Sequence, residues 1–206
     1  MKTAIASLSV AALAGIASAQ TLYTSDFNAP LYSDGALIGQ DGWVITGSSV
    51  VNPINIANTG TNGNVTLATT GQDVRRPFAP QTANSVFLQF DMVMLTAAAT
   101  GDYFIHLGDG GTSNFYARVY ARSSGAGFQM ALGTSAGAVS YGSTVLNFGQ
   151  TYTVVARYDF VAGAANDTGA LYIDPTTPGG TGDTPYVLAT TIGTDATTIA
   201  AVAVTS

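Results

Sequence analysis

Residues 115–122 read Phe-Tyr-Ala-Arg-Val-Tyr-Ala-Arg, a stretch in which the side-chain character changes at every step. The odd-numbered positions are apolar, and the even-numbered positions are Tyr or Arg. Side chains of a β-strand point alternately to the two faces of a sheet, so this stretch predicts a strand with one buried face and one polar face. It is the clearest two-faced strand in the chain.

The same alternation recurs on both sides of this stretch. Residues 85–95, 128–132 and 152–160 carry apolar side chains at alternate positions, and shorter strand candidates lie at residues 171–173, 186–188 and 199–204. Segments rich in Gly, Asn, Asp, Ser or Pro separate them, and no later segment keeps a helical period with caps at both ends. We therefore predict an all-β fold, a two-sheet antiparallel sandwich formed by residues 20–206 as one domain. The last strand candidate ends close to Ser206, so the sequence also allows a truncated C-terminus.

The composition supports strands and excludes several chemistries. The 206 residues include 12 Asp, five Arg, one Lys and one His, with neither Glu nor Cys. Charged residues make up only 9% of the chain, so hydroxyls, amides and glycines must cover the surface, which suits strands and turns better than exposed helices. Without Cys, the chain has no thiolate nucleophile, no Cys-ligated metal and no disulfide.

The first 19 residues have the organisation of a secretory signal peptide. Lys2 supplies the positive start, residues 4–16 form a short apolar run, and Ala17-Ser18-Ala19 is a small-x-small cleavage site. We therefore expect residues 1–19 to lie outside the fold and the protein to be secreted or displayed at the cell surface. The processed chain has no candidate transmembrane segment. It carries five Arg against 12 Asp, a net charge of −7, which disfavours binding to nucleic acid or to an anionic membrane surface.

Several motifs together suggest a family: Asp26-Phe27-Asn28, residues 35–43 (Gly-Ala-Leu-Ile-Gly-Gln-Asp-Gly-Trp), residues 106–110, residues 115–118, residues 151–160 and residues 171–175. They resemble the concanavalin A-like lectin and glucanase (LamG-type) domains of exported bacterial surface proteins, including those with a PEP-CTERM sorting tail. The resemblance covers most of residues 22–175. It implies a jelly-roll sandwich that is non-catalytic in most such surface proteins. This sequence lacks the sorting tail, and it cannot contain the Glu-x-Asp-x-Glu strand of the related glucanases.

A carbohydrate site needs a flat aromatic ring for the apolar face of a sugar and polar groups for its hydroxyls. Trp43, the only Trp, follows Gln40 and Asp41 in a turn bracketed by glycines, so the three could form such a site. The alternative is that Trp43 packs in the core at the start of a strand.

The polar face of the opening strand is a second candidate site, formed by Tyr116, Arg118, Tyr120 and Arg122. On an outward sheet surface these residues would place planar guanidinium donors between aromatic rings. Cross-strand packing, and pairing of Arg with the excess Asp, explain the same residues without a ligand.

Asp109 and Asn114 flank a Gly-rich loop and offer side-chain oxygens of the kind that Ca²⁺ prefers. Their spacing does not match an EF-hand, and a self-capping turn accounts for the same residues. Calcium is therefore the one cofactor that the sequence suggests.

Catalysis is the weaker hypothesis. Glycosidases place two carboxyl groups across the scissile bond, and here only Asp could supply them, with Asp91 and Asp159 inside predicted strands. His106 lies in a predicted strand at residues 103–107, where we expect a hydrogen-bonded structural histidine and not a member of a serine triad. We predict no catalytic residue and a non-catalytic extracellular module that binds carbohydrate or another surface polymer. The alternatives are a structural or adhesive surface protein without a small ligand, and a fragment of a polysaccharide-cleaving enzyme.

Overall fold

The computed structural model describes residues 2–13, 20–68, 70–134, 139–177, 182–190 and 194–206. These residues form strands, turns and loops, so no apolar helix that could cross a membrane occurs among them. The strands are β1 (Lys2–Leu13), β2 (Gln20–Ser25), β3 (Gly35–Ala36), β4 (Val44–Thr46), β5 (Asn55–Ala57), β6 (Asn64–Leu67), β7 (Asp73–Gln81), β8 (Ser85–Thr96), β9 (Asp102–Gly108), β10 (Phe115–Ser124), β11 (Gly127–Gly133), β12 (Leu146–Asn147), β13 (Thr151–Asp159), β14 (Thr168–Ile173), β15 (Val187–Thr190) and β16 (Ile199–Val204).

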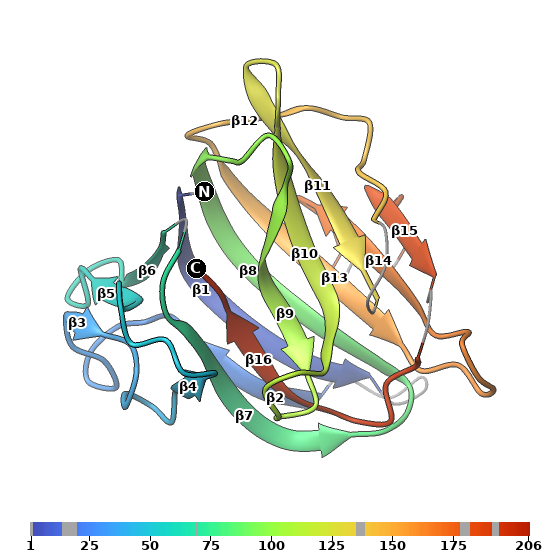
Figure 1. Ribbon diagram of the computed structural model, residues 1–206, viewed down its shortest axis with the longest axis horizontal. Coiled ribbons are helices and arrows are strands. Elements are labelled where there is room, and N and C mark those ends of the chain that lie inside the picture. Colours follow the sequence, from blue (N-terminus) through green and yellow to red (C-terminus); the bar gives the residue numbers. More distant parts are fainter. Residues whose placement is uncertain (1, 14–19, 69, 135–138, 178–181, 191–193) are drawn as a thin grey trace.

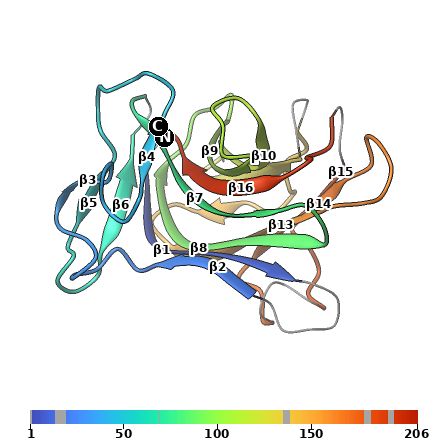
Figure 2. The same cartoon turned by 90° about the horizontal axis from the view of Figure 1, so that it is seen from below.

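In the described parts of the chain, the strands form two antiparallel sheets that lie one over the other (Figure 1, Figure 2). Sheet A has the order β15-β14-β13-β8-β1-β6-β5-β3, with β2 also paired to β1. Sheet B has the order β12-β11-β10-β9-β16-β7-β4. The predicted all-β fold of two antiparallel sheets is confirmed.

The main core lies between the two sheets, where alternate side chains from both meet. The rings of Phe90 from β8 and Phe104 from β9 pack edge to face, with centroids 6.0 Å apart. Trp43, Tyr158 and Phe128 are among the largest fully buried side chains. Aromatic rings of this size each bury a large apolar area, so they dominate the packing energy of a chain that has no disulfide.

The later strands lie close to where the alternation predicts them. The predicted strand at residues 199–204 coincides with β16, and the one at residues 85–95 is one residue shorter than β8. The strands β3, β4 and β5 have only two or three residues, too few to show a period of two in the sequence. The alternation in the sequence therefore does not predict these three strands.

The N-terminal segment differs from the expectation. Residues 2–13 form β1 inside sheet A, where β1 pairs with β8 on one edge and with β2 and β6 on the other. Ile5, Leu8 and Val10 are buried in the core. Ile5 and Leu8 are three positions apart, and both can face the core because the pairing of β1 with β8 is irregular between Ile5 and Ser7. In the full-length chain, residues 2–13 thus belong to sheet A. That residues 1–19 are a signal peptide, removed after Ala19, stays a prediction; residues 14–19 lie outside the described parts.

Candidate functional site

The strongest candidate for a ligand surface is the outer face of sheet B along β9 and β10. Val119 and Ala121 point into the core, so Arg118, Tyr120 and Arg122, which alternate with them, point outward. Tyr103 of β9 lies directly opposite Tyr120 and therefore shares this face. The prediction that Arg118, Tyr120 and Arg122 lie on one face of a strand is confirmed.

The side chains on this face form a continuous row. The guanidinium carbon of Arg118 lies 5.6 Å from the ring centroid of Tyr103 and 5.5 Å from that of Tyr120. The Arg122 guanidinium lies over the ring of Tyr141, 4.1 Å from its centroid. We call Tyr103, Phe115, Arg118, Tyr120, Arg122 and Tyr141 the aromatic–arginine row; each of these side chains is partly exposed.

The row is held in place by neighbours that sequence reasoning did not assign to it. Arg122 donates from Nε and from one terminal nitrogen to Gln129 Oε1, at 3.3 and 3.0 Å. Gln129 lies directly opposite Arg122 on β11. Cation–π contact with Tyr141 and these two hydrogen bonds fix the plane of the guanidinium. Tyr141 comes from a distant loop, so no local sequence signal could have placed it there.

His106 lies beneath the row and is fully enclosed. Its ring centroid is 4.3 Å from that of Phe115 and 5.8 Å from that of Tyr103. Nδ1 lies 2.9 Å from the Leu107 carbonyl oxygen, which can only accept, so Nδ1 carries the proton. Burial lowers the pKa of His106 to about 4, and the positive charge of Arg118 acts in the same direction. His106 is thus a neutral support for the row.

Tyr116 does not join the row, which corrects the predicted set. Its side chain is only 8% exposed and packs edge to face with the Tyr158 ring in the core, with centroids 5.8 Å apart. The cause is an irregularity between Tyr116 and Val119, where Ala117 has a φ of 45°. A bulge of this kind inserts one residue and reverses the alternation on its far side. Phe115 therefore takes the outward place that the sequence pattern assigns to Tyr116.

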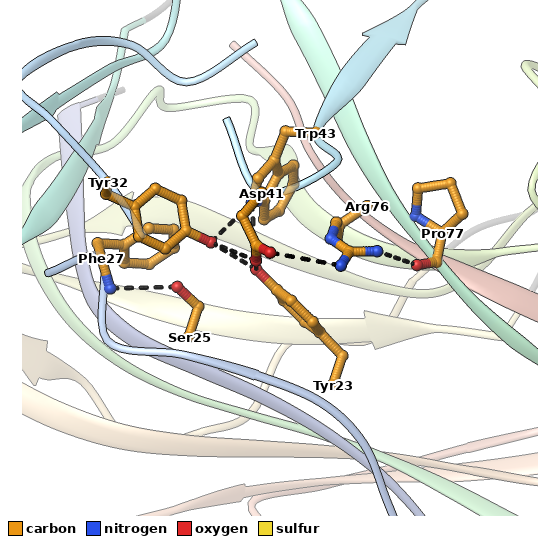
Figure 3. A network of polar contacts seen from close by, with 8 residues as sticks. All are labelled: Tyr23, Ser25, Phe27, Tyr32, Asp41, Trp43, Arg76 and Pro77. Carbon is orange, nitrogen blue, oxygen red and sulfur yellow. Dashed lines mark hydrogen bonds and ion pairs between the residues drawn. The ribbon is translucent and has the colours of Figure 1, made fainter. Parts of the chain in front are cut away.

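Asp41 and Trp43 belong to a network of polar contacts with Tyr23, Tyr32 and Arg76 (Figure 3). Trp43 is fully buried, and its Nε1 donates to the Tyr23 hydroxyl at 3.2 Å. Asp41 Oδ2 accepts hydrogen bonds from the hydroxyls of Tyr23 and Tyr32, at 3.0 and 2.9 Å. Burial, followed by the contact with Tyr32, raises the pKa of Tyr23.

Asp41 also forms an ion pair with Arg76, at 3.5 Å. Gln40 serves the same turn from its outer side: Oε1 accepts from the Ser33 backbone N–H at 2.8 Å, and Nε2 donates to the Ala36 carbonyl at 2.7 Å. Gln40, Asp41 and Trp43 thus belong to one turn, in which Gln40 bonds on the outer side and Trp43 packs in the core. The burial of Trp43 leaves no exposed ring face for a sugar.

The candidate calcium residues meet in a turn of their own. Asp109 Oδ1 accepts from the Gly111 backbone N–H, and Asp109 Oδ2 accepts from Asn114 Nδ2, both at 2.7 Å. This is a self-capped turn in which the Asn114 amide turns its nitrogen, not its oxygen, toward the carboxylate. In the described parts of the chain, no three His or Asp side chains gather as a metal site would require.

The strand carboxylates are occupied by hydroxyl and guanidinium donors. Asp91 accepts from Ser7 Oγ at 2.8 Å and from Thr153 Oγ1 at 2.6 Å. Asp159 accepts from Ser85 Oγ at 2.6 Å and is paired with Arg157 at 3.0 Å. Both carboxylates belong to sheet A and therefore lie away from the aromatic–arginine row.

The chain matches no family model, no curated protein and no solved structure. Its fold and candidate site alone define it, as an antiparallel β-sandwich protein with an aromatic–arginine row on the outer face of sheet B.

Proposed function

We propose that this protein is a non-catalytic extracellular β-sandwich module, of the concanavalin A-like jelly-roll type, that binds carbohydrate or another surface polymer. The observation that carries the proposal is the aromatic–arginine row on the outer face of sheet B. The signal-peptide organisation of residues 1–19 supports a secreted or cell-surface location.

The row has the two components that a sugar-binding surface requires. Partly exposed rings of Tyr103, Tyr120 and Tyr141 offer apolar faces, and Arg118 and Arg122 lie against them with planar sets of donors. Because the rings and guanidiniums already constrain one another, little side-chain entropy is lost when a polymer is bound. The row also follows a strand direction, which suits an extended chain of sugar units.

The two guanidiniums also indicate which polymers to test first. The chain has only five Arg against 12 Asp, and two of those Arg lie in this row. A guanidinium binds carboxylates in a two-pronged geometry. A polymer that bears uronic acid groups would therefore satisfy the row better than a neutral polymer.

The test is a retention screen of the full chain against neutral and uronate-bearing polysaccharides, with release of reducing ends measured in the same samples. We expect retention without release. The Tyr120→Ala variant should lose most of the retention while its unfolding temperature changes little, because Tyr120 is partly exposed. Release of reducing ends would support the enzyme alternative, and the absence of retention on every polymer would support a purely structural role.

A further inference from the structure

Strand β1 connects two parts of sheet A that otherwise do not pair. Along one edge its pairs run from Lys2 opposite Thr96 to Leu13 opposite Ser85, which spans the whole of β8. Along the other edge its first residues pair with β6 and its later residues with β2. Figure 1 shows β1 beside β8 in the middle of the sheet. Without β1, backbone donors and acceptors on three strands would lose their partners.

The place that β1 fills, which we call the strand slot, also recognises side chains. Ile5, Leu8 and Val10 are at most 1% exposed and belong to the core between the sheets. On the same strand, Thr3 Oγ1 donates to Met94 Sδ at 3.0 Å, and Ser7 Oγ donates to Asp91 Oδ2 at 2.8 Å. The slot therefore selects apolar side chains at set positions and hydroxyls at others.

Residues 2–13, which fill the strand slot, belong to the segment that the sequence predicts to be a cleaved signal peptide. The predicted cleavage site, Ala17-Ser18-Ala19, lies in the connection between β1 and β2. Cleavage there would leave β1 attached to the sheet by non-covalent contacts alone. An unpaired strand edge next to exposed core residues is unfavourable and pairs readily with another strand.

We propose that the strand slot is an acceptor site for an added strand. Once the chain is cut between Leu13 and Gln20, the slot takes an extended polypeptide segment of about ten residues that runs antiparallel to β8, by β-strand addition. The segment carries apolar side chains where β1 has Ile5, Leu8 and Val10. This site goes beyond polymer binding, because it lies in sheet A and the aromatic–arginine row lies in sheet B.

The test uses the full chain with a specific protease site inserted between Leu13 and Gln20, so that the protein folds before it is cut. The probe is a fluorescent synthetic peptide with the sequence of residues 2–13. We expect the cut protein to take up the probe and, in excess peptide, to melt at the temperature of the uncut protein. The matched control peptide carries Ile5→Asp and Leu8→Asp, which would bury two charges, so it should bind at least about ten-fold more weakly.

The uncut chain is the second control, since its slot is filled by its own β1 and it should take up little probe. Three results would overturn the proposal: equal uptake of both peptides, equal uptake by cut and uncut protein, or loss of residues 1–13 after cutting with no change in melting temperature. A dimer of the cut protein that excess peptide cannot dissociate would also overturn it, because the slot would then be closed by a second copy. Polysaccharide retention measured on the same cut protein separates this result from the proposed function.

Discussion

The turn at Trp43 and the outer face of sheet B are built from the same kinds of side chain, and they differ in where the rings lie. In the turn, Trp43 is fully buried, and its neighbours Asp41, Tyr23 and Tyr32 bond to one another. On sheet B, the rings of Tyr103 and Tyr120 contact each other and Arg118, and all three side chains stay partly exposed. The comparison teaches that an aromatic residue beside polar groups marks a ligand surface only when those polar groups leave a ring face open.

The largest effect expected from this comparison is on stability, from Trp43→Ala. Removing a fully buried Trp leaves a cavity and deprives the Tyr23 hydroxyl of its donor, so the free energy of unfolding should fall by about 3 to 5 kcal/mol. Chemical denaturation measures it. Polysaccharide retention per folded molecule should stay at the wild-type level. A loss of polysaccharide retention at unchanged stability would instead show that Trp43 belongs to the ligand site.

A slightly smaller effect on stability is expected at low pH, from protonation of His106 beneath the row. Its folded-state pKa is lowered from 6.5 to about 4 by burial, so the unfolded chain takes up the proton first as the pH falls. The stability that the neutral imidazole contributes is complete above pH 6.5 and is lost toward pH 4, by up to about 3 kcal/mol. Denaturation curves at several pH values compare wild type with His106→Gln, which should lack this part of the pH dependence. Parallel curves for the two proteins would contradict the account.

A third test concerns the hydrogen bonds that Asp41 accepts in the Trp43 turn, away from the aromatic–arginine row. Asp41→Ala would leave the hydroxyls of Tyr23 and Tyr32 without their shared acceptor in a mostly buried site, at a cost of about 1 to 3 kcal/mol. Thermal unfolding should show the loss, and retention on polysaccharide should not change. If Asp41→Ala instead abolished retention in a fully folded protein, the turn would be the binding site after all.

The smallest effect is expected in the Asp109 turn. Calcium held there would raise the melting temperature with its concentration by mass action, and EDTA would reverse the rise. Both carboxylate oxygens already accept hydrogen bonds within the turn, so we expect EDTA to leave the melting temperature unchanged. A fall on chelation that Asp109→Asn abolishes would instead establish a calcium site.

The sequence could predict the regular strands because alternation is a local signal. Residues 85–95 have an apolar side chain at every even-numbered position, and β8 forms there. Residues 199–204 are an apolar run of strand length, and β16 forms there. The bulge at Ala117 reverses the alternation, and no Gly or Pro marks it in the sequence. The alternation therefore assigns Tyr116 to the wrong face. Trp43 is hydrogen-bonded to Tyr23 and Tyr32, which come from outside the turn, so the turn sequence alone could not predict its burial.

The leader-like segment shows the same limit in another form. Its composition indicates export, whereas in the full-length chain residues 2–13 pair with β8 as a strand. Composition alone cannot decide between these two roles, since the deciding contacts come from residues more than 70 positions away along the chain.

The binding role of the aromatic–arginine row is tested by comparing Arg118→Gln with Arg157→Gln in isothermal titration against the polysaccharide that the full chain retains. Both Arg side chains lie against a Tyr ring and are partly exposed, but Arg157 is on sheet A. We expect at least about a ten-fold loss of affinity for Arg118→Gln and less than about two-fold for Arg157→Gln. Equal affinities for the two variants would contradict a binding role of the row.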